Sequence, residues 1–305
     1  MSDCEKHVPV LLREAVAALA VKPGGRYVDG TLGRAGHARA IAALGGEVLG
    51  IDRDGQAVAE VEAMGIAGLR TEKGNHGDIR EIAERAGWRE ADGVLLDLGV
   101  SSPQLDEAGR GFSFMREGPL DMRMDRSGGL TAADIVNGKG EERLAELFRE
   151  LGEEPQARRF ARAIARARGE GRRFETTTQL AGFLERISPR RGGRHPATRV
   201  FQALRMAVND ELGELRRALS GALAILRGGG RLAVITFESL TDREVKSFFA
   251  AHIGREESLQ QGGSAWRGEL PRMMAVWRRA ATPSTEEIES NPRSRSARLR
   301  VAEKE

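Results

Sequence analysis

The chain has 305 residues, a formal net charge of +3 and hydrophobic residues at 40% of positions, which allows one large domain or two smaller ones. Because it has no apolar run of about 18 residues and no basic-then-apolar leader in residues 1–10, we expect a soluble, cytoplasmic protein that does not span a membrane. The single cysteine, Cys4, excludes an internal disulfide and a cysteine-based metal site. We expect no metal, since His7, His37 and His76 lack ligand spacing.

Short apolar runs alternate with helix-forming runs through the first hundred residues. This alternation is typical of a parallel sheet with right-handed crossovers, so the sequence predicts an α/β, Rossmann-like fold. The predicted strands lie near 26–29, 47–51, 67–71 and 92–97, and the predicted helices at 35–44, 54–63 and 78–86.

Closely spaced glycines, Gly30-x-x-Gly33-x-x-Gly36, follow the first predicted strand and precede a helix. Glycine tolerates positive φ and lets a ligand approach the backbone, while the first-turn amides of the helix supply donors. The turn therefore predicts a nucleoside-binding site at the carboxyl edge of the sheet. Its spacing differs from the dinucleotide fingerprint Gly-x-Gly-x-x-Gly.

An acid ends each of three predicted strands: Asp29, Asp52 and Asp97. Asp52 lies about 20 residues beyond the glycine turn, where an acid can accept hydrogen bonds from a ribose. Two chemistries fit such a crevice: a nicotinamide dehydrogenase, or methyl transfer from S-adenosylmethionine. The glycine spacing favours methyl transfer, and so does the segment 97–104 (DLGVSSPQ), which places an acid, two hydroxyls and a proline where an acceptor base can lie.

The alternation stops after Asp97. Residues 101–129 lack helical periodicity and predict a functional loop or lid, residues 131–197 are helical, and a single amphipathic helix is predicted over 200–226. A strand near 231–237, a helix near 241–251 and an edge strand near 272–277 follow, before a polar tail that we expect to be poorly ordered. The predicted boundaries are 1–107 for the first part of the sheet domain, 108–205 for an inserted helical domain, 206–282 for the second part of the sheet domain and 283–305 for a basic polar C-terminal tail.

Arginine accounts for 42 of the 48 basic residues, and the arginines cluster at 158–173 and 190–205, in or beside the insertion. A charged helical face is often only solvated. Two clusters flanking a long loop, however, favour a surface that follows the phosphates of a nucleic acid, to which residues 291–300 could add contacts.

Five segments closely resemble the bacterial small-subunit ribosomal RNA cytosine-N4 methyltransferases of the MraW/RsmH type. The most specific is 95–106 (LLDLGVSSPQLD), with RGFSF at 110–114 and PLDMRMD at 119–125. The resemblance implies a class I S-adenosylmethionine-dependent methyltransferase fold with an inserted all-helical domain. It further implies methylation of a decoding-region cytosine in 16S ribosomal RNA. The sequence leaves open whether the substrate is free RNA or the small subunit, and whether the protein is a monomer or a homodimer. The five segments are 27–37, 93–125, 195–205, 229–232 and 291–296.

The resemblance also implies which residues bind the cofactor. Three positions depart from the usual family pattern: Ala35 replaces a common glycine, His76 stands where phenylalanine is usual, and Glu238 replaces a common histidine. The implied cofactor-binding positions are Ala35, Gly36, His37, Asp52, His76, Asp97 and Gln104.

The exocyclic amine of cytosine is a poor nucleophile because its lone pair is delocalised into the ring. Acceptors for the amine hydrogens and in-line placement against the methyl group would improve it. We assign these contacts to Ser102 and the Pro103 carbonyl, with Asp97 positioning the cofactor or the amine. Attack through ring carbon 5 would need a cysteine, and Cys4 is badly placed for it. The alternative to an enzyme is a catalytically silent scaffold that binds RNA.

Overall fold

The computed structural model describes residues 9–99, 107–189, 193, 195–258 and 264–305. The chain divides into two compact units, one made of residues 1–99 and 212–305 and the other of residues 100–211. Both boundaries that we placed from the sequence, at 107 and 205, fall inside the second unit. Asn209 belongs to this unit because its side chain bonds the backbone of Met122 and Met124.

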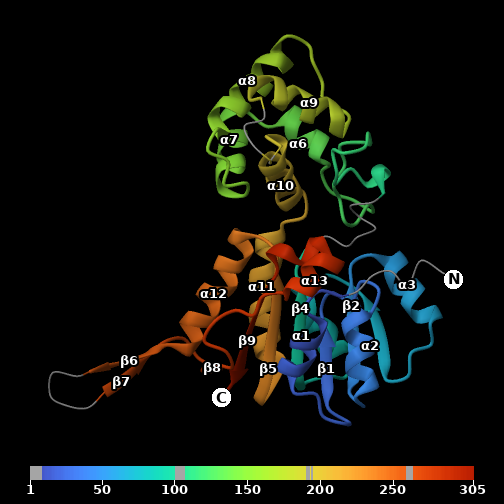
Figure 1. Ribbon diagram of the computed structural model, residues 1–305, viewed down its shortest axis with the longest axis vertical. Helices are drawn as coiled ribbons and strands as arrows, with labels where there is room; N and C mark the ends of the chain where they lie inside the picture. Colours follow the sequence, from blue (N-terminus) through green and yellow to red (C-terminus); the bar gives the residue numbers. More distant parts are fainter. Residues whose placement is uncertain (1–8, 100–106, 190–192, 194, 259–263) are drawn as a thin grey trace. The chain divides into compact units, whose positions relative to one another are not determined.

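The first unit is built on a seven-stranded sheet of order β3-β2-β1-β4-β5-β9-β8 (Figure 1). The first five of these strands are mutually parallel, whereas β9 is antiparallel to β5 and to β8. The α/β prediction is confirmed. The strands are β1 (Arg26–Asp29), β2 (Glu47–Asp52), β3 (Leu69–Lys73), β4 (Ala91–Asp97), β5 (Leu226–Thr236), β8 (Met273–Ala275) and β9 (Arg298–Lys304), and a separate ribbon pairs β6 (Arg255–Ser258) with β7 (Ser264–Arg267).

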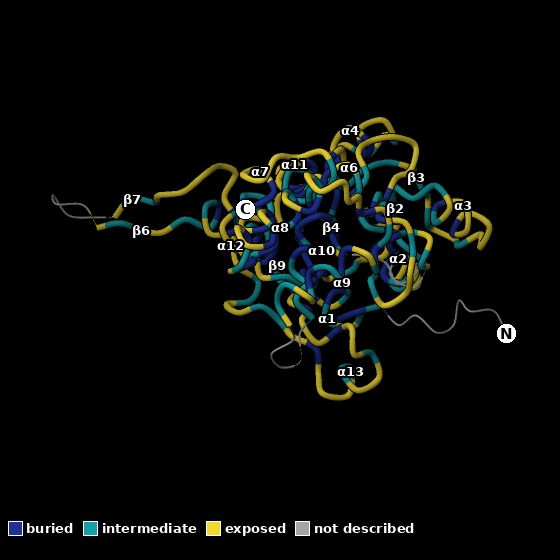
Figure 2. Tube along the Cα trace, turned by 90° about the horizontal axis from the view of Figure 1, so that it is seen from above, coloured by how far each residue is buried: buried dark blue, intermediate teal, exposed yellow. Residues whose placement is uncertain are grey.

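Helices cover both faces of the sheet because its central strands are apolar on both sides. In β4, Val94 and Leu96 enter one core and Leu95 enters the other. The second core contains residues of α1, α2 and α3, and the first contains residues of α4, α11 and α12. Figure 2 shows the buried central strands. The helices are α1 (Leu12–Leu19), α2 (Gly36–Ala43), α3 (Gly55–Ala63), α4 (Ile79–Arg85), α11 (Glu211–Ile225), α12 (Ser239–Ile253) and α13 (Thr285–Ser290), with short turns η2 (His76–Asp78) and η4 (Pro292–Ser296).

Two expectations were wrong. The helix predicted over 200–226 is two helices, because Asp210 adopts a left-handed φ of 47° and Asn209 ends the first of them. The C-terminal tail is not poorly ordered: it forms α13, η4 and β9, and β9 lies inside the sheet between β5 and β8. The charged residues of the tail suggested disorder, although Leu299 and Val301 of β9 are buried.

The second unit has its own helical core, in which Phe148, Phe160 and Phe174 are fully buried. Capping boxes begin two of its helices, at Thr131 and Thr176. Across the described ranges of both units, no helix is long and apolar enough to cross a membrane. The helices are α6 (Ala132–Gly138), α7 (Glu141–Glu150), α8 (Ala157–Gly169), α9 (Thr177–Ile187) and α10 (Ala197–Val208), with a short turn η3 (Ala108–Arg110).

Candidate cofactor and active site

The glycine turn joins the end of β1 to the start of α2. Gly33 and Ala35 both adopt left-handed conformations, with φ of 50° and 59°. The Leu32 amide donates to the Ile51 carbonyl at 3.0 Å, which holds the turn against β2. Because the methyl group of Ala35 is fully buried in the apolar core, the departure from glycine adds no bulk on the exposed side of the turn. The first-turn amides of α2 have no intrahelical acceptor and can bind an anionic group.

Asp52 ends β2 and organises the same turn from the other side. Its Oδ2 accepts from the Gly33 amide at 2.8 Å, and its Oδ1 accepts from the Asp54 amide at 2.9 Å. Burial raises the pKa of Asp52, although these two amide hydrogen bonds oppose the shift. Each carboxylate oxygen keeps a second lone pair, so Asp52 can still accept a hydrogen bond from a ligand hydroxyl.

Asp29 and Asp97, at the ends of β1 and β4, lie on either side of Thr31. The Thr31 amide donates to Asp29 Oδ1 at 3.1 Å, and the Thr31 hydroxyl accepts from the Asp97 amide at 2.6 Å. His37 Nε2 donates to the Val10 carbonyl at 3.1 Å, which leaves Nδ1 at 3.9 Å from Asp97 Oδ2. The chain therefore brings the glycine turn, His37 and Asp97 together.

The Asp97 carboxyl is poised to accept a ligand group. Its Oδ1 is buried and has no hydrogen-bond partner among the described residues. Burial and the nearby Asp29 carboxyl raise the pKa of Asp97 to about 7, and burial above all raises that of Asp29 to about 7. A buried acceptor without a partner costs free energy, so this oxygen fits a cationic or hydrogen-bond-donating ligand.

His76 lies in η2, directly after β3. Burial, together with the positive charges of Arg53 and Arg217, lowers the pKa of His76 to about 3, so its ring is neutral at pH 7. A Cβ built on Gly30 would lie 3.6 Å from His76 Cβ, which places the histidine beside the glycine turn. A neutral imidazole here can stack on a heteroaromatic base.

Not every predicted site residue can be placed. Ser102, Pro103 and Gln104 lie outside the described residues. Glu238 is the N-cap residue of α12, and its side chain does not cap that helix. Thr31 was missed, although its position two residues after Asp29, between Gly30 and Gly33, is a sequence signal for a residue that supports the strand ends.

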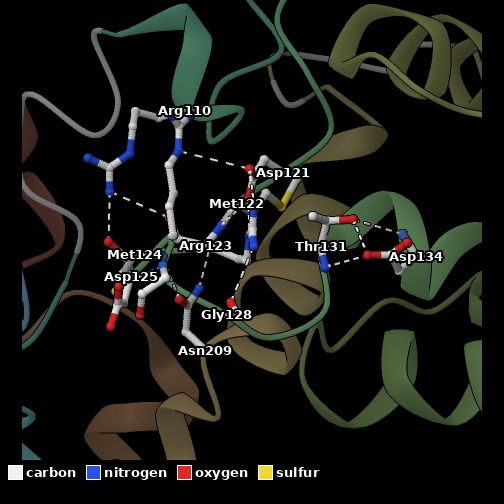
Figure 3. A network of polar contacts seen from close by, with 12 residues as sticks. Arg110, Asp121, Met122, Arg123, Met124, Asp125, Gly128, Thr131, Asp134 and Asn209 are labelled. Atoms are coloured by element: carbon white, nitrogen blue, oxygen red, sulfur yellow. Dashed lines mark hydrogen bonds and ion pairs between the residues drawn. The ribbon is translucent and has the colours of Figure 1, made fainter.

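In the second unit, a polar network fixes the segment 119–129 (Figure 3). Asp121 accepts two hydrogen bonds from the Arg123 guanidinium, at 2.8 and 3.0 Å, and Arg110 donates to the Met124 carbonyl at 2.9 Å. The side-chain amide of Asn209 donates through Nδ2 to the Met122 carbonyl at 2.8 Å, and its Oδ1 accepts from the backbone amide of Met124 at 2.8 Å. The described part of the predicted loop is therefore a hydrogen-bonded segment within its unit.

A sheet of this order with one reversed strand, a glycine turn after β1 and acids at the ends of β2 and β4 defines a class I methyltransferase. The chain belongs to the MraW methylase family, whose model matches residues 4–305. Three relatives carry the name "Ribosomal RNA small subunit methyltransferase H". They come from Methylobacterium nodulans (49% identity, covering 100% of this chain and 92% of the relative), Rhizobium leguminosarum bv. trifolii (48%, 97% and 86%) and Symbiobacterium thermophilum (47%, 98% and 96%).

Proposed function

We propose that this protein transfers a methyl group from S-adenosylmethionine to N4 of a cytosine in the decoding region of small-subunit ribosomal RNA. The observation that carries the proposal is the unpartnered, buried oxygen of Asp97, which lies at the end of β4 beside a glycine turn and a ribose-type acid. The names of the relatives support small-subunit ribosomal RNA as the substrate. The N4 position and the decoding-region cytosine rest on the sequence resemblance.

The residues of the first unit fit the methyl donor. We assign the ribose hydroxyls to Asp52, the base to the neutral ring of His76, and the amino acid part to the α2 amides of Gly36 and His37. Asp97 Oδ1 accepts from the ammonium group of the donor or from the target amine, which would satisfy the orphaned oxygen. Gln104 is a further proposed contact. The donor supplies an electrophilic methyl group on a sulfonium sulfur.

The protein must position and activate a weak nucleophile. We assign Ser102 and the Pro103 carbonyl to accept the amine hydrogens, which favours a nitrogen whose lone pair faces the methyl group. The amine nitrogen loses one proton when it takes the methyl group. A carboxyl whose pKa is about 7, such as that of Asp97, can hold or release a proton at physiological pH.

We assign RNA recognition to the inserted helical unit. Its α8 carries exposed arginines on one side, and its opposite side packs Phe160 and Ile164 into the core. Two of them, Arg162 and Arg166, pair with Glu141 and Glu170. Exposed arginines with no acidic partner, such as Arg158, are suited to phosphate contacts. The unit lacks every residue that we assign to the cofactor except Gln104, which separates the two binding functions along the chain.

A single assay tests this function. The protein is incubated with methyl-labelled S-adenosylmethionine and either immature small subunits or free 16S ribosomal RNA, and the RNA is digested and its nucleosides are separated. We expect label in N4-methylcytidine. RNA binding without label would favour a silent scaffold, label in 5-methylcytidine would contradict the N4 assignment, and tight binding of NAD with no binding of S-adenosylmethionine would favour a dehydrogenase.

A further inference from the structure

A polar cluster that includes Glu214 lies against Gly77, the residue after His76. Glu214, in the first turns of α11, pairs through Oε1 with Arg217 Nη2 at 2.6 Å. Its other oxygen, Oε2, is buried and has no hydrogen-bond partner within the described ranges. A buried carboxylate oxygen without a donor is costly, so its retention needs an explanation.

The position of this oxygen is set by Gly77. A Cβ on Gly77 would overlap Glu214 Oε2, so only glycine leaves room for the carboxylate beside η2. The Gly77 amide donates to Asn75 Oδ1 at 3.2 Å, and Arg53 donates to the same oxygen at 3.3 Å. Glu214 therefore belongs to a group of neighbouring residues that also contains Arg53, Asn75 and Gly77. Arg53 directly follows Asp52, and Gly77 directly follows His76.

Pairing with Arg217 does not explain this placement. The Arg217 side chain is 51% exposed, whereas that of Glu214 is 12% exposed. A carboxylate that served only the ion pair could direct both oxygens at the exposed guanidinium, as Glu244 does toward Arg216 with two bonds of 2.9 Å. Glu214 instead directs only Oε1 at Arg217, and its Oε2 lies against Gly77.

We propose that Glu214 Oε2 accepts a hydrogen bond from the exocyclic N6 amine of the adenine of the methyl donor, and so selects adenine over other purines. This inference rests on the proposed function, which places the ribose at Asp52 and the base beside His76. The adenine amine is the hydrogen-bond donor of that base edge, and a carboxylate accepts but cannot donate. A 6-oxo purine would present an acceptor to the same oxygen and be rejected.

The test compares two ligands that differ at purine position 6, S-adenosylhomocysteine and S-inosylhomocysteine, by titration calorimetry. Wild-type protein should bind the adenine ligand roughly ten- to a hundredfold more tightly, the range for a hydrogen bond to a charged group. Glu214→Gln should reduce this preference to a few-fold, since an amide can also donate to a 6-oxo group. Gly77→Ala should do the same by displacing the carboxylate. Arg216→Gln, whose side chain pairs with α12, is the matched control and should leave the preference unchanged.

Equal changes in affinity for both ligands in Glu214→Gln, or no change for either, would overturn the inference while leaving the proposed function intact. Wild-type protein that binds neither ligand would overturn the proposed function together with the inference. Because the ratio of two affinities is measured, a general loss of stability in either variant does not imitate the expected result.

Discussion

The hydroxyl of Thr31 accepts a hydrogen bond from the amide of Asp97 at 2.6 Å, so the glycine turn after β1 is tied to the end of β4. The backbone amide of Thr31 also donates a hydrogen bond to Asp29 Oδ1. Thr31 thus links the ends of β1 and β4 and holds the turn between them.

Replacing Thr31 by valine should therefore damage both stability and cofactor binding. Valine keeps the shape but leaves the Asp97 amide without its acceptor, at a cost of about 1–3 kcal/mol. Thermal denaturation and titration calorimetry with S-adenosylhomocysteine measure the two effects. Thr31→Ser keeps the hydroxyl and is the matched control. If valine and serine behaved alike, the hydrogen bond would have no role in the site.

The raised pKa values of Asp29 and Asp97 predict how the ligand-free protein responds to pH. A carboxyl whose pKa is about 7 when folded, against an ordinary value near 4, binds more protons in the folded state, so stability falls as pH rises from about 4 to 7. Asp97→Asn removes one of these penalties. Because a quarter of the Asp97 side chain is exposed, we expect a modest gain in stability at pH 8, on the order of 1–2 kcal/mol. Melting temperatures from pH 5 to 9 measure it.

Asp97→Asn should at the same time weaken cofactor binding, and wild-type affinity should rise with pH through about 7, as the carboxylate forms. Calorimetry in two buffers of different ionisation enthalpy should detect proton release on binding below pH 7. Glu84→Gln, an exposed residue paired with Arg80, controls for the loss of one negative charge. Affinity independent of pH would argue against an ionised Asp97 as the acceptor.

Asp52→Ala should weaken binding of S-adenosylhomocysteine by about 1–3 kcal/mol, because it removes the proposed ribose acceptor and loosens the Gly33 amide. Asp54→Ala offers a control two residues away. It removes the N-cap of α3, where the side chain accepts from Gln56 at 3.0 Å, and should cost about 1 kcal/mol of stability without reducing affinity. Unchanged affinity in Asp52→Ala would refute the ribose assignment.

Features whose cause is local were predictable from the sequence. The glycine turn and the acids at the ends of β1, β2 and β4 follow from short-range patterns, because parallel strands end at one edge of the sheet. The helix break at Asn209 was not predictable from the sequence, since the apolar positions of α10 and α11 continue the same spacing across it. Strand β9 was missed because its burial comes from neighbours far along the chain.

The roles of the arginines in the insertion were also not predictable, since the sequence alone does not distinguish arginines that support the fold from exposed ones. Arg168 donates to the carbonyls of Val136 and Lys139, both at 2.6 Å, and so caps the end of α6. Arg159 donates to the Ile187 carbonyl at the end of α9, at 2.7 Å. These two arginines support their unit, so their guanidinium groups are engaged within the protein.

Arg158 and Arg173 are exposed and make no ion pair or hydrogen bond within the described ranges, which leaves both guanidinium groups available to phosphates. We expect the double variant Arg158→Gln, Arg173→Gln to keep its melting temperature and its cofactor affinity but to bind RNA less tightly. Each lost phosphate contact should flatten the slope of log affinity against log salt by roughly 0.7–0.9. Filter binding of 16S ribosomal RNA fragments from 50 to 200 mM salt measures this slope.

Arg168→Gln is the informative comparison, because it removes a positive charge from the same helical unit at a position that supports the fold. It should lower the melting temperature, since the carbonyls at the end of α6 lose their donor, while the salt slope of the remaining folded protein stays close to that of wild type. If the double variant kept the wild-type slope, Arg158 and Arg173 would be only solvated surface residues. A methylation defect that persisted at saturating RNA would instead give these residues a part in holding the target nucleotide for reaction.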